Sequence, residues 1–405
     1  MDSEVGVLQA KLDKSALKGV KPKQRIQSHS FQELSLGLAV ELSYRKASEM
    51  MNRFLHRSGD AAVRSTTLED RVEAFGCALS AAYEDKAGEI LESNQIDRQS
   101  GVVGENSVIP SAVRAPDLPA ALGQKQARRL MADYNRGKES RMKIRYGEQV
   151  ANTEASPERC CYISVDDVGV KSQKERRKGG AKRSKKYVEN TVIHIHSDGK
   201  QYAITAVGMD KAFKLLMAFL LENRLMENRR LIFFTDGAAN IRDRIKRMFA
   251  FREHTIILDW LHLEKKCMEY MSMAVKGTKT EKETLKRTLV SILWTGRADR
   301  ALEYLGSIKE ENIKSHKILG DLEGYLGRKA PDMACYALRH ELGLRISSNR
   351  VEKENDLVVA SRQKHNGMAW SEKGSAALAI ITAARRNGEL HSFVIKRQIG
   401  FKLVG

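Results

Sequence analysis

Apolar, β-branched runs alternate with turn-forming residues between residues 159 and 262. Runs of this length, bounded by Gly, Asp and Ser, predict short buried strands. They cover residues 160–170, 190–196, 201–207, 230–235 and 254–258. Apolar stripes at helical spacing over 210–228 and 240–251 predict helices between the last three strands. The expected order is therefore three strands as a meander, then helix, strand, helix and strand.

Helical periodicity dominates on both sides of this strand-rich segment. Over 31–100, a loop near Ser58-Gly59-Asp60 precedes a capping-box pattern at 65–69, which opens a helix running to Phe75-Gly76. Residues 77–100 predict another helix. A helix, a tight turn and a capped helix outline a helix-turn-helix module, although the same spacing is typical of ordinary helical hairpins. Residues 263–345 show no strand pattern and predict helices throughout.

These changes of pattern divide the chain into seven segments, and the fold class that they predict is α/β. The segments are a basic arm (1–30), a helix-turn-helix-like region (31–100), a linker with a basic helix (101–158), the first part of the strand-rich core (159–262), an all-helical insertion (263–345), C-terminal helices of the core (346–390) and a tail (391–405).

The composition favours a polyanionic partner. The 405 residues carry a formal net charge of +19, with a pI of about 9.6. Nucleic acid is the first candidate for such a partner. We expect no membrane partner, because no stretch of about 18 apolar residues occurs. The first residues lack the apolar segment of a signal peptide, so a cytoplasmic protein is expected. The five cysteines include no Cys-x-x-Cys pair, so a zinc site is not indicated.

Three acids stand at positions that suit metal chemistry. Asp166 and Asp236 each end an apolar strand, and Glu352 lies in a helical segment. Convergent carboxylates hold the hard ions Mg²⁺ or Mn²⁺, and two such ions support phosphoryl transfer. Neighbouring strand residues point to opposite faces, so only one of Asp166 and Asp167 enters such a site, and we choose Asp166. Taken singly, each aspartate is equally typical of a strand-end acid that caps a turn.

Three further groups of residues bear on the site. Asp356 follows Glu352 by one helical turn and shares its face, where it either supports the metal site or belongs to a solvated acidic surface. His194 and His196 alternate along a strand, and we interpret them as exposed residues and not as ligands. The loop between the first two strands holds nine bases against one acid, which is typical of a solvated loop or of a phosphate contact. Its candidate DNA-binding residues are Lys174, Arg176, Arg177, Lys178, Lys182, Arg183, Lys185 and Lys186.

Four motifs, taken in order over residues 160–390, resemble a known family. They are Val165-Asp166-Asp167-Val168-Gly169-Val170, then Thr235-Asp236-Gly237-Ala238, then Leu258-Asp259-Trp260-Leu261-His262, and finally Arg350-Val351-Glu352 with Asn355, Leu357-Val358-Val359, Arg362 and Gly367-Met368-Ala369-Trp370-Ser371 after it. The chain is similar to bacterial insertion-sequence transposases of the DDE class, nearest to the ISKra-type and ISLre-type groups.

The resemblance implies an RNase H-like catalytic core, in which the first and fourth strands lie side by side, and a helical N-terminal DNA-binding region. It implies that Asp166, Asp236 and Glu352 hold two Mg²⁺ or Mn²⁺ ions. His262, Asp259 and Asp167 would support the site, and Arg362 would contact DNA. The expected activity is cutting element ends and joining them to target DNA, by a homo-oligomer on double-stranded DNA at the nucleoid. A repurposed DNA-binding protein without catalysis and an RNase H-fold nuclease remain alternatives.

Overall fold

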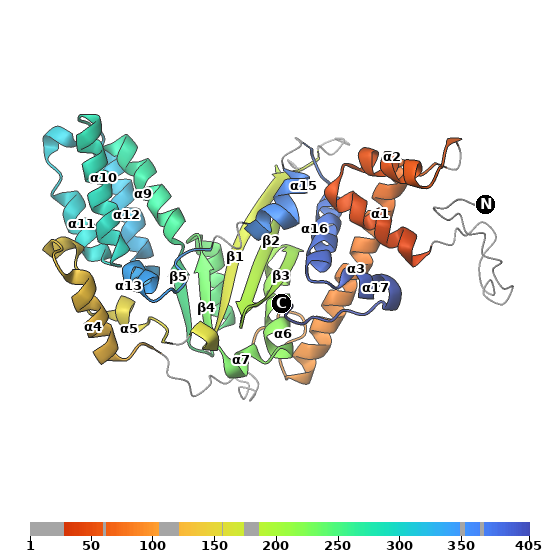
Figure 1. Cartoon of the computed structure of the whole chain (residues 1–405), viewed down its shortest axis with the longest axis horizontal. Coiled ribbons are helices and arrows are strands. Elements are labelled where there is room, and N and C mark those ends of the chain that lie inside the picture. Colours follow the sequence, from red (N-terminus) through yellow and green to blue (C-terminus); the bar gives the residue numbers. More distant parts are fainter. Residues whose placement is uncertain are drawn as a thin grey trace.

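A mixed five-stranded sheet lies at the centre of the molecule in the computed structural model, which describes residues 28–59, 62–104, 121–155, 157–173, 186–348, 353–364 and 368–405 (Figure 1). The strands are β1 (Cys160–Lys171), β2 (Tyr187–Ser197), β3 (Lys200–Val207), β4 (Arg230–Thr235) and β5 (His254–Leu258). Their order in the sheet is β3-β2-β1-β4-β5. All five predicted strands are confirmed, with boundaries shifted by only a few residues.

The directions of the strands follow from how they are connected. β1, β2 and β3 form an antiparallel meander with a tight turn at Asp198-Gly199 between β2 and β3, whereas helical crossovers make β4 parallel to β1 and β5 parallel to β4. The expectation that the first and fourth strands are neighbours is confirmed. Central parallel strands are covered on both faces, which is why Leu231 to Thr235 of β4 are all buried. β4 therefore ends beside the middle of β1, at the centre of the sheet.

Helices cover both faces and both ends of the sheet. Before the sheet come α1 (His29–Glu41), α2 (Tyr44–Phe54), α3 (Ser65–Ser93), α4 (Gln124–Asn135) and α5 (Glu148–Ala151). Between and after the strands come α6 (Met209–Glu222), α7 (Leu225–Asn228), α8 (Ala239–Met248), α9 (Trp260–Ala274), α10 (Lys279–Trp294), α11 (Ala298–Gly306), α12 (His316–Lys329) and α13 (Tyr336–Glu341). The chain ends with a π-helical turn, η8 (Asp356–Ala360), and with α15 (Ser361–Gln363), α16 (Glu372–Arg386) and α17 (Leu390–Lys396).

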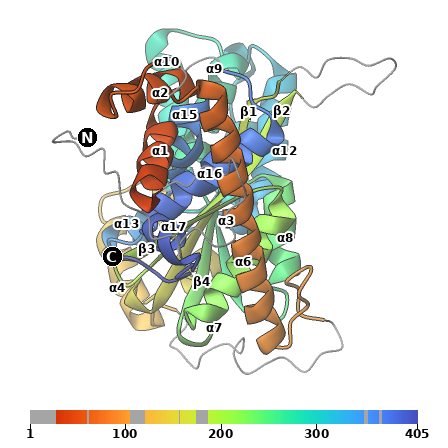
Figure 2. The ribbon, with the colours of Figure 1, turned by 90° about the vertical axis from the view of Figure 1, so that its right-hand side faces the viewer.

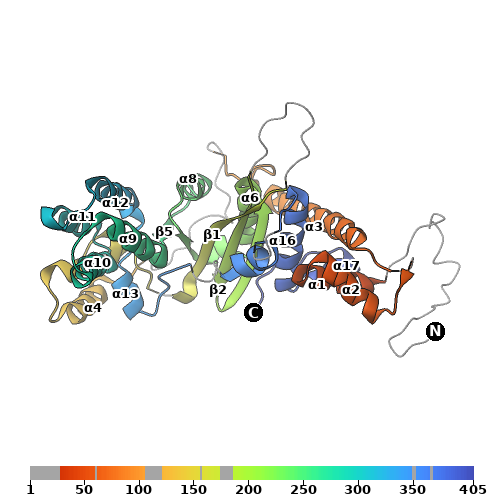
Figure 3. The same ribbon diagram turned by 90° about the horizontal axis from the view of Figure 1, so that it is seen from above.

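Two hydrophobic cores meet at the sheet. One core joins α1, α3, α6, α8 and α16 to the sheet, and the other joins β4 and β5 to α9, α10, α11 and α12. Figure 3 shows the sheet between these two helical groups. The predicted all-helical insertion is confirmed as helical over residues 263–345. α16 is capped by Ser371, whose hydroxyl accepts a hydrogen bond from the backbone N–H of Gly374 at 2.9 Å.

The N-terminal region differs from the prediction at two points. The helix that was expected to stop at Gly76 continues to Ser93 as one element, α3. The capping-box interpretation is also wrong, because α3 begins at Ser65 after Arg64, and no side chain caps it. Figure 2 shows α3 running past α16 and α6, with which it is in contact. The candidate recognition helix therefore packs on the central core through Leu68, Val72 and Phe75.

Gly76 explains why a glycine lies inside this long helix. A Cβ atom at position 76 would lie 2.4 Å from the Cβ and 2.5 Å from the Cα of Ala377 in α16. Such distances are far below van der Waals contact, so α3 and α16 can approach this closely only at a residue without a side chain. The glycine that resembles a helix end in the sequence is a helix-crossing point in the fold.

Replacing Gly76 with Ala should destabilise the protein by about 1–3 kcal/mol, because the new methyl group overpacks the α3–α16 contact. The matched control is Gly37→Ala in α1, where a Cβ atom meets nothing within 4 Å. That change should instead stabilise the helix by up to about 1 kcal/mol. Urea unfolding of the two variants measures both effects. A gain of stability in both variants would contradict the packing argument.

Candidate functional site

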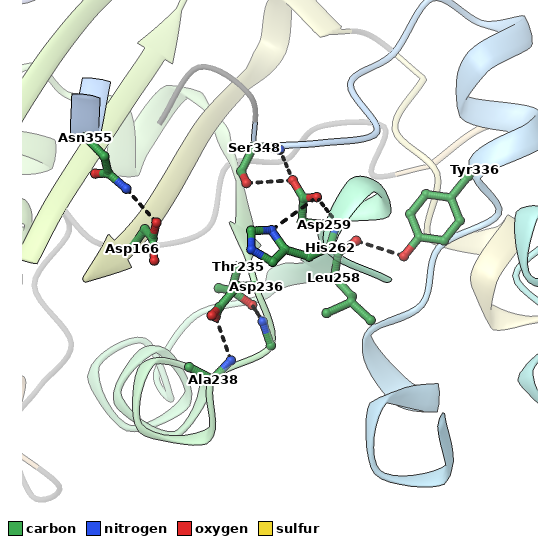
Figure 4. A network of polar contacts seen from close by, with 11 residues as sticks. Asp166, Thr235, Asp236, Ala238, Leu258, Asp259, His262, Tyr336, Ser348 and Asn355 are labelled. Atoms are coloured by element: carbon green, nitrogen blue, oxygen red, sulfur yellow. Dashed lines mark hydrogen bonds and ion pairs between the residues drawn. The ribbon is translucent and has the colours of Figure 1, made fainter. Parts of the chain in front are cut away.

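Two of the predicted acids come together just beyond the point where the pairing of β1 with β4 stops. Ser164 of β1 lies opposite Phe234 of β4 in a parallel pair. Asp166 and Asp236 each follow two residues later, so both carboxylates extend from the same face of the sheet at the same level. Figure 4 shows the two side chains with the groups that hold them. Their negative charges act on each other, which would be unfavourable without further partners.

Asp166 is held from two sides. One carboxylate oxygen accepts a hydrogen bond from the backbone N–H of Asp167 at 2.8 Å. The other accepts one from the Nδ2 of Asn355, just before η8, at 2.5 Å. Burial of the carboxylate, followed by the charge of Asp236, raises the pKa of Asp166 to about 6. Among the described residues, neither Asp166 nor Asp236 forms an ion pair with a Lys or Arg.

A tight turn fixes Asp236. Its Oδ1 accepts a hydrogen bond from the backbone N–H of Ala238 at 2.7 Å, and Thr235 Oγ1 accepts one from Gly237 N–H at 3.2 Å. Gly237 has φ +87°, and a Cβ atom there would lie 2.8 Å from Leu258 Cδ1. Glycine is therefore required for both conformation and space. The ammonium group of Lys329 in α12 donates a hydrogen bond to the carbonyl of Gly237.

Asp259 is fully buried behind the site and serves as a structural acid. Its carboxylate caps α9 by accepting from the backbone N–H of His262 at 2.8 Å, and it accepts from both the backbone N–H and the hydroxyl of Ser348. Burial alone would raise the pKa of Asp259, but the hydrogen bonds from His262 and Ser348 outweigh burial and lower it. These bonds engage both oxygens, so Asp259 positions α9 and the chain at Ser348.

His262 connects Asp259 to the two acids in front. Its Nδ1 lies 3.6 Å from an Asp259 oxygen. Its charge also reaches Asp166 and lowers the pKa of that residue, against the larger effects of burial and Asp236. Figure 4 shows the His262 ring between the side chains of Asp259 and Asp236. The structure thus brings Asp166, Asp236 and His262 close to one another.

The other predicted site residues have different surroundings. Asp167 accepts a hydrogen bond from Thr191 Oγ1 at 2.6 Å, and burial raises its pKa. Asp356 is exposed in η8, and Lys186 is exposed at the start of β2. The interpretation of His194 as an exposed residue is wrong. Its side chain is 1% exposed, because the adjoining strand and helices cover this part of β2.

Arg362 does not suit the DNA contact predicted for it. Its side chain is 4% exposed and lies over the rings of Tyr44 and Trp370, with centroid distances of 5.3 and 5.0 Å. Its Nε donates to the carbonyl of Ala39 at 3.0 Å. The guanidinium group therefore joins α1 and α2 to the C-terminal helices, and a buried group with these partners cannot reach a phosphate.

Glu352, the third predicted acid, lies outside the described residues. So do seven of the basic loop residues: Lys174, Arg176, Arg177, Lys178, Lys182, Arg183 and Lys185. Among the residues that the structure describes, no group of three or more His, Cys, Asp or Glu side chains is arranged to hold a metal ion. The donor chemistry at the strand ends nevertheless fits Mg²⁺ or Mn²⁺, since two carboxylates approach each other without a basic side chain between them.

Sequence reasoning gave no role to three residues of this site. Asn355 was visible only as part of a motif, three positions after Glu352. Ser348 and Lys329 carry no local signal, because each reaches its partner from an element far away in the sequence. The spacing of Asn355 is the one clue that the sequence offered, since residues three apart share a helix face.

Comparison with models of known protein families finds no match for this chain, and a search of curated proteins finds none either. No helix within the described ranges is both long enough and apolar enough to cross a lipid bilayer.

Replacing Asp259 with Asn should destabilise the protein by about 1.5–3 kcal/mol at pH 7, because an amide cannot accept all the bonds from Ser348 and His262. The folded-state pKa of Asp259 is lowered. Its contribution is therefore complete above the unfolded-state pKa, about 3.9, and is lost as the pH falls through the folded-state value. Urea unfolding over a pH series measures the difference between wild type and variant, with the exposed Asp243→Asn as control. A constant difference down to the lowest pH would contradict this assignment.

Proposed function

We propose that this chain is a DNA transposase of the DDE class, with an RNase H-like catalytic core. The observation that carries the proposal is the meeting of Asp166 and Asp236 just beyond the paired residues of two adjacent parallel strands, β1 and β4. The strand order β3-β2-β1-β4-β5 supports it, because this is the arrangement that the family resemblance implies. The net charge of +19 supports a nucleic-acid substrate.

The proposed reaction has two steps with the same chemistry. Water attacks the phosphorus at an element end, the P–O3′ bond breaks, and a free 3′-hydroxyl results. This hydroxyl then attacks a phosphodiester of the target DNA, which joins the strands and releases a target 3′-hydroxyl. Two bound Mg²⁺ or Mn²⁺ ions would activate the attacking oxygen, neutralise the phosphate and stabilise the leaving oxygen. Asp166 and Asp236 would hold these ions, with Glu352 as the third ligand.

The spacing around Asn355 supports the proposed role of Glu352. Asn355 donates to Asp166, and Glu352 precedes it by three positions. Residues three apart share a face of a helix, so a helical continuation would direct Glu352 toward the same carboxylate. The π-helical turn that follows at Asp356 adds support, because such turns occur frequently at functional sites.

The rest of the chain would bind and organise DNA. The basic loop between β1 and β2 would hold phosphates near the site, and the N-terminal helices would contact the element end. Joining two ends requires two active sites, so the protein would act as a homo-oligomer on DNA. It would do so in the cytoplasm, at the nucleoid.

Asp236→Asn should abolish joining, because it removes one of the two carboxylates that extend from the strand ends. The assay is strand transfer in Mn²⁺, with the terminal sequences flanking the protein's own coding sequence as donor DNA. The matched control is Asp243→Asn, which neutralises an exposed acid on α8 and should leave joining unchanged. Salt-sensitive DNA binding without cleavage in any variant would instead indicate a repurposed binding protein. Cleavage without joining would indicate a nuclease.

Asn355→Ala should lower the rate of joining about 10- to 100-fold, as expected for loss of a group that orients a metal ligand. The variant should also need more Mn²⁺ for half-maximal activity, a readout that simple destabilisation does not move. Lys353→Ala, which changes an exposed residue two positions away, is the control. An unchanged Mn²⁺ requirement in Asn355→Ala would show that the amide does not position Asp166.

A further inference from the structure

Positive charge exceeds negative charge around a second buried acid near the site. Asp332, which follows α12, is 6% exposed and forms an ion pair with Arg242 of α8 at 2.8 Å. Burial raises the pKa of Asp332, and the charges of Arg242, Lys246 and Lys329 all oppose that rise. Arg242 thus pairs with the Asp332 carboxylate, and the charges of Lys246 and Lys329 also act on it. We call these four residues the Asp332 cluster.

The Asp332 cluster adjoins the turn that carries Asp236. The aliphatic part of Lys329 lies against Gly237, since a Cβ atom at that glycine would lie 3.1 Å from Lys329 Cε. The Lys329 ammonium donates to the Gly237 carbonyl, one residue after Asp236. An ammonium group has three donors, so Lys329 can hold this carbonyl and still donate to a second acceptor.

The two lysines of the cluster differ in how far they are engaged. Lys329 is half-buried, and its bond to Gly237 gives it a structural role. Lys246 is exposed on α8 and takes part in no hydrogen bond or ion pair within the described part of the chain. The other charged residues of α8 and α12 do not cancel the excess, because Asp243, Asp321 and Glu323 add three acids whereas Arg244, Arg247, Lys317 and Arg328 add four bases.

Phosphodiester oxygen is the acceptor that suits this arrangement. The carboxylates of Asp166 and Asp236 would hold metal ions, and the lysines of the Asp332 cluster would bind a phosphate of the same substrate. We propose that Lys329 and Lys246 bind a backbone phosphate that flanks the scissile phosphate on the DNA strand entering the site. The inference rests on the proposed function for the identity of the substrate. It assigns α12 of the helical insertion and α8 of the core to one phosphate contact.

The competing explanation is that Lys329 only stabilises the Gly237 turn and that Lys246 is an ordinary surface residue. Lys246→Ala separates the two, because Lys246 has no described bond whose loss would disturb the fold. Lys329→Met keeps the aliphatic stem over Gly237 and removes the charge. The matched control is the double variant Lys276→Ala/Lys279→Ala, which removes two exposed charges beyond the far end of α9. That helix has 15 residues and is therefore about 22 Å long.

The experiment measures binding of the full-length chain to a fluorescein-labelled DNA duplex by anisotropy, over about 50–200 mM KCl. Each phosphate contact that is lost should reduce the slope of log K against log salt by about 0.9. The Lys246→Ala/Lys329→Met protein loses both lysines of this single contact and should therefore lose about 0.9 of this slope, and Lys246→Ala alone should lose part of that amount. The Lys276→Ala/Lys279→Ala control should keep the wild-type slope. Thermal melting of each variant checks that the fold is intact.

The inference would be overturned if the Lys246→Ala/Lys329→Met protein kept the wild-type slope of log K against log salt. It would also be overturned if this variant and the Lys276→Ala/Lys279→Ala control lost the same amount of slope. Either result leaves the proposed function untouched, because strand transfer and its dependence on Asp236 are measured separately. Conversely, a selective loss of slope in a protein that never cleaves DNA would support the phosphate contact and contradict the transposase. A wild-type protein that does not bind the duplex would overturn both.

Discussion

Two like charges held together where the pairing of β1 with β4 stops are the constraint on which the rest of the structure depends. Burial and mutual repulsion both oppose ionisation of Asp166 beside Asp236. The fold offsets this cost with hydrogen bonds that are available only here: the backbone N–H groups of Asp167 and Ala238, and the amide of Asn355. Parallel pairing of β1 with β4 makes the two acids neighbours, and the two hydrophobic cores bury the paired strands.

The groups around these acids form contacts that hold the surrounding elements in place. Asp259 joins the end of β5, the start of α9 and the chain at Ser348, and this fixes the position of His262. Deeper in the molecule, Arg339 and Glu154 form a buried ion pair through two contacts of 2.5 Å. A buried pair of this kind is costly to break, so it ties the helical insertion to the segment that precedes β1. The insertion is thereby held firmly enough for Lys329 to reach the Asp236 turn.

The N-terminal helices are part of the same scaffold. α3 crosses α16 at Gly76, and Arg362 lies between aromatic rings from α2 and from the chain before α16. Residues far apart in the sequence thus share one core with the sheet. A region that the sequence suggests as a separate module is therefore packed against the elements that carry the site.

The sequence by itself determined the strands, their order along the chain and the positions of the two aspartates. Apolar, β-branched runs and the turn residues that bound them are local signals. Adjacency of β1 and β4 followed only through the family resemblance. Three things were decided by the tertiary structure. Gly76 continues a helix because Ala377 approaches it, Arg362 is buried because aromatic rings enclose it, and Asn355 and Lys329 reach the site from distant elements. Such roles depend on which surfaces meet, and no property of a residue's own neighbours in the sequence encodes that meeting.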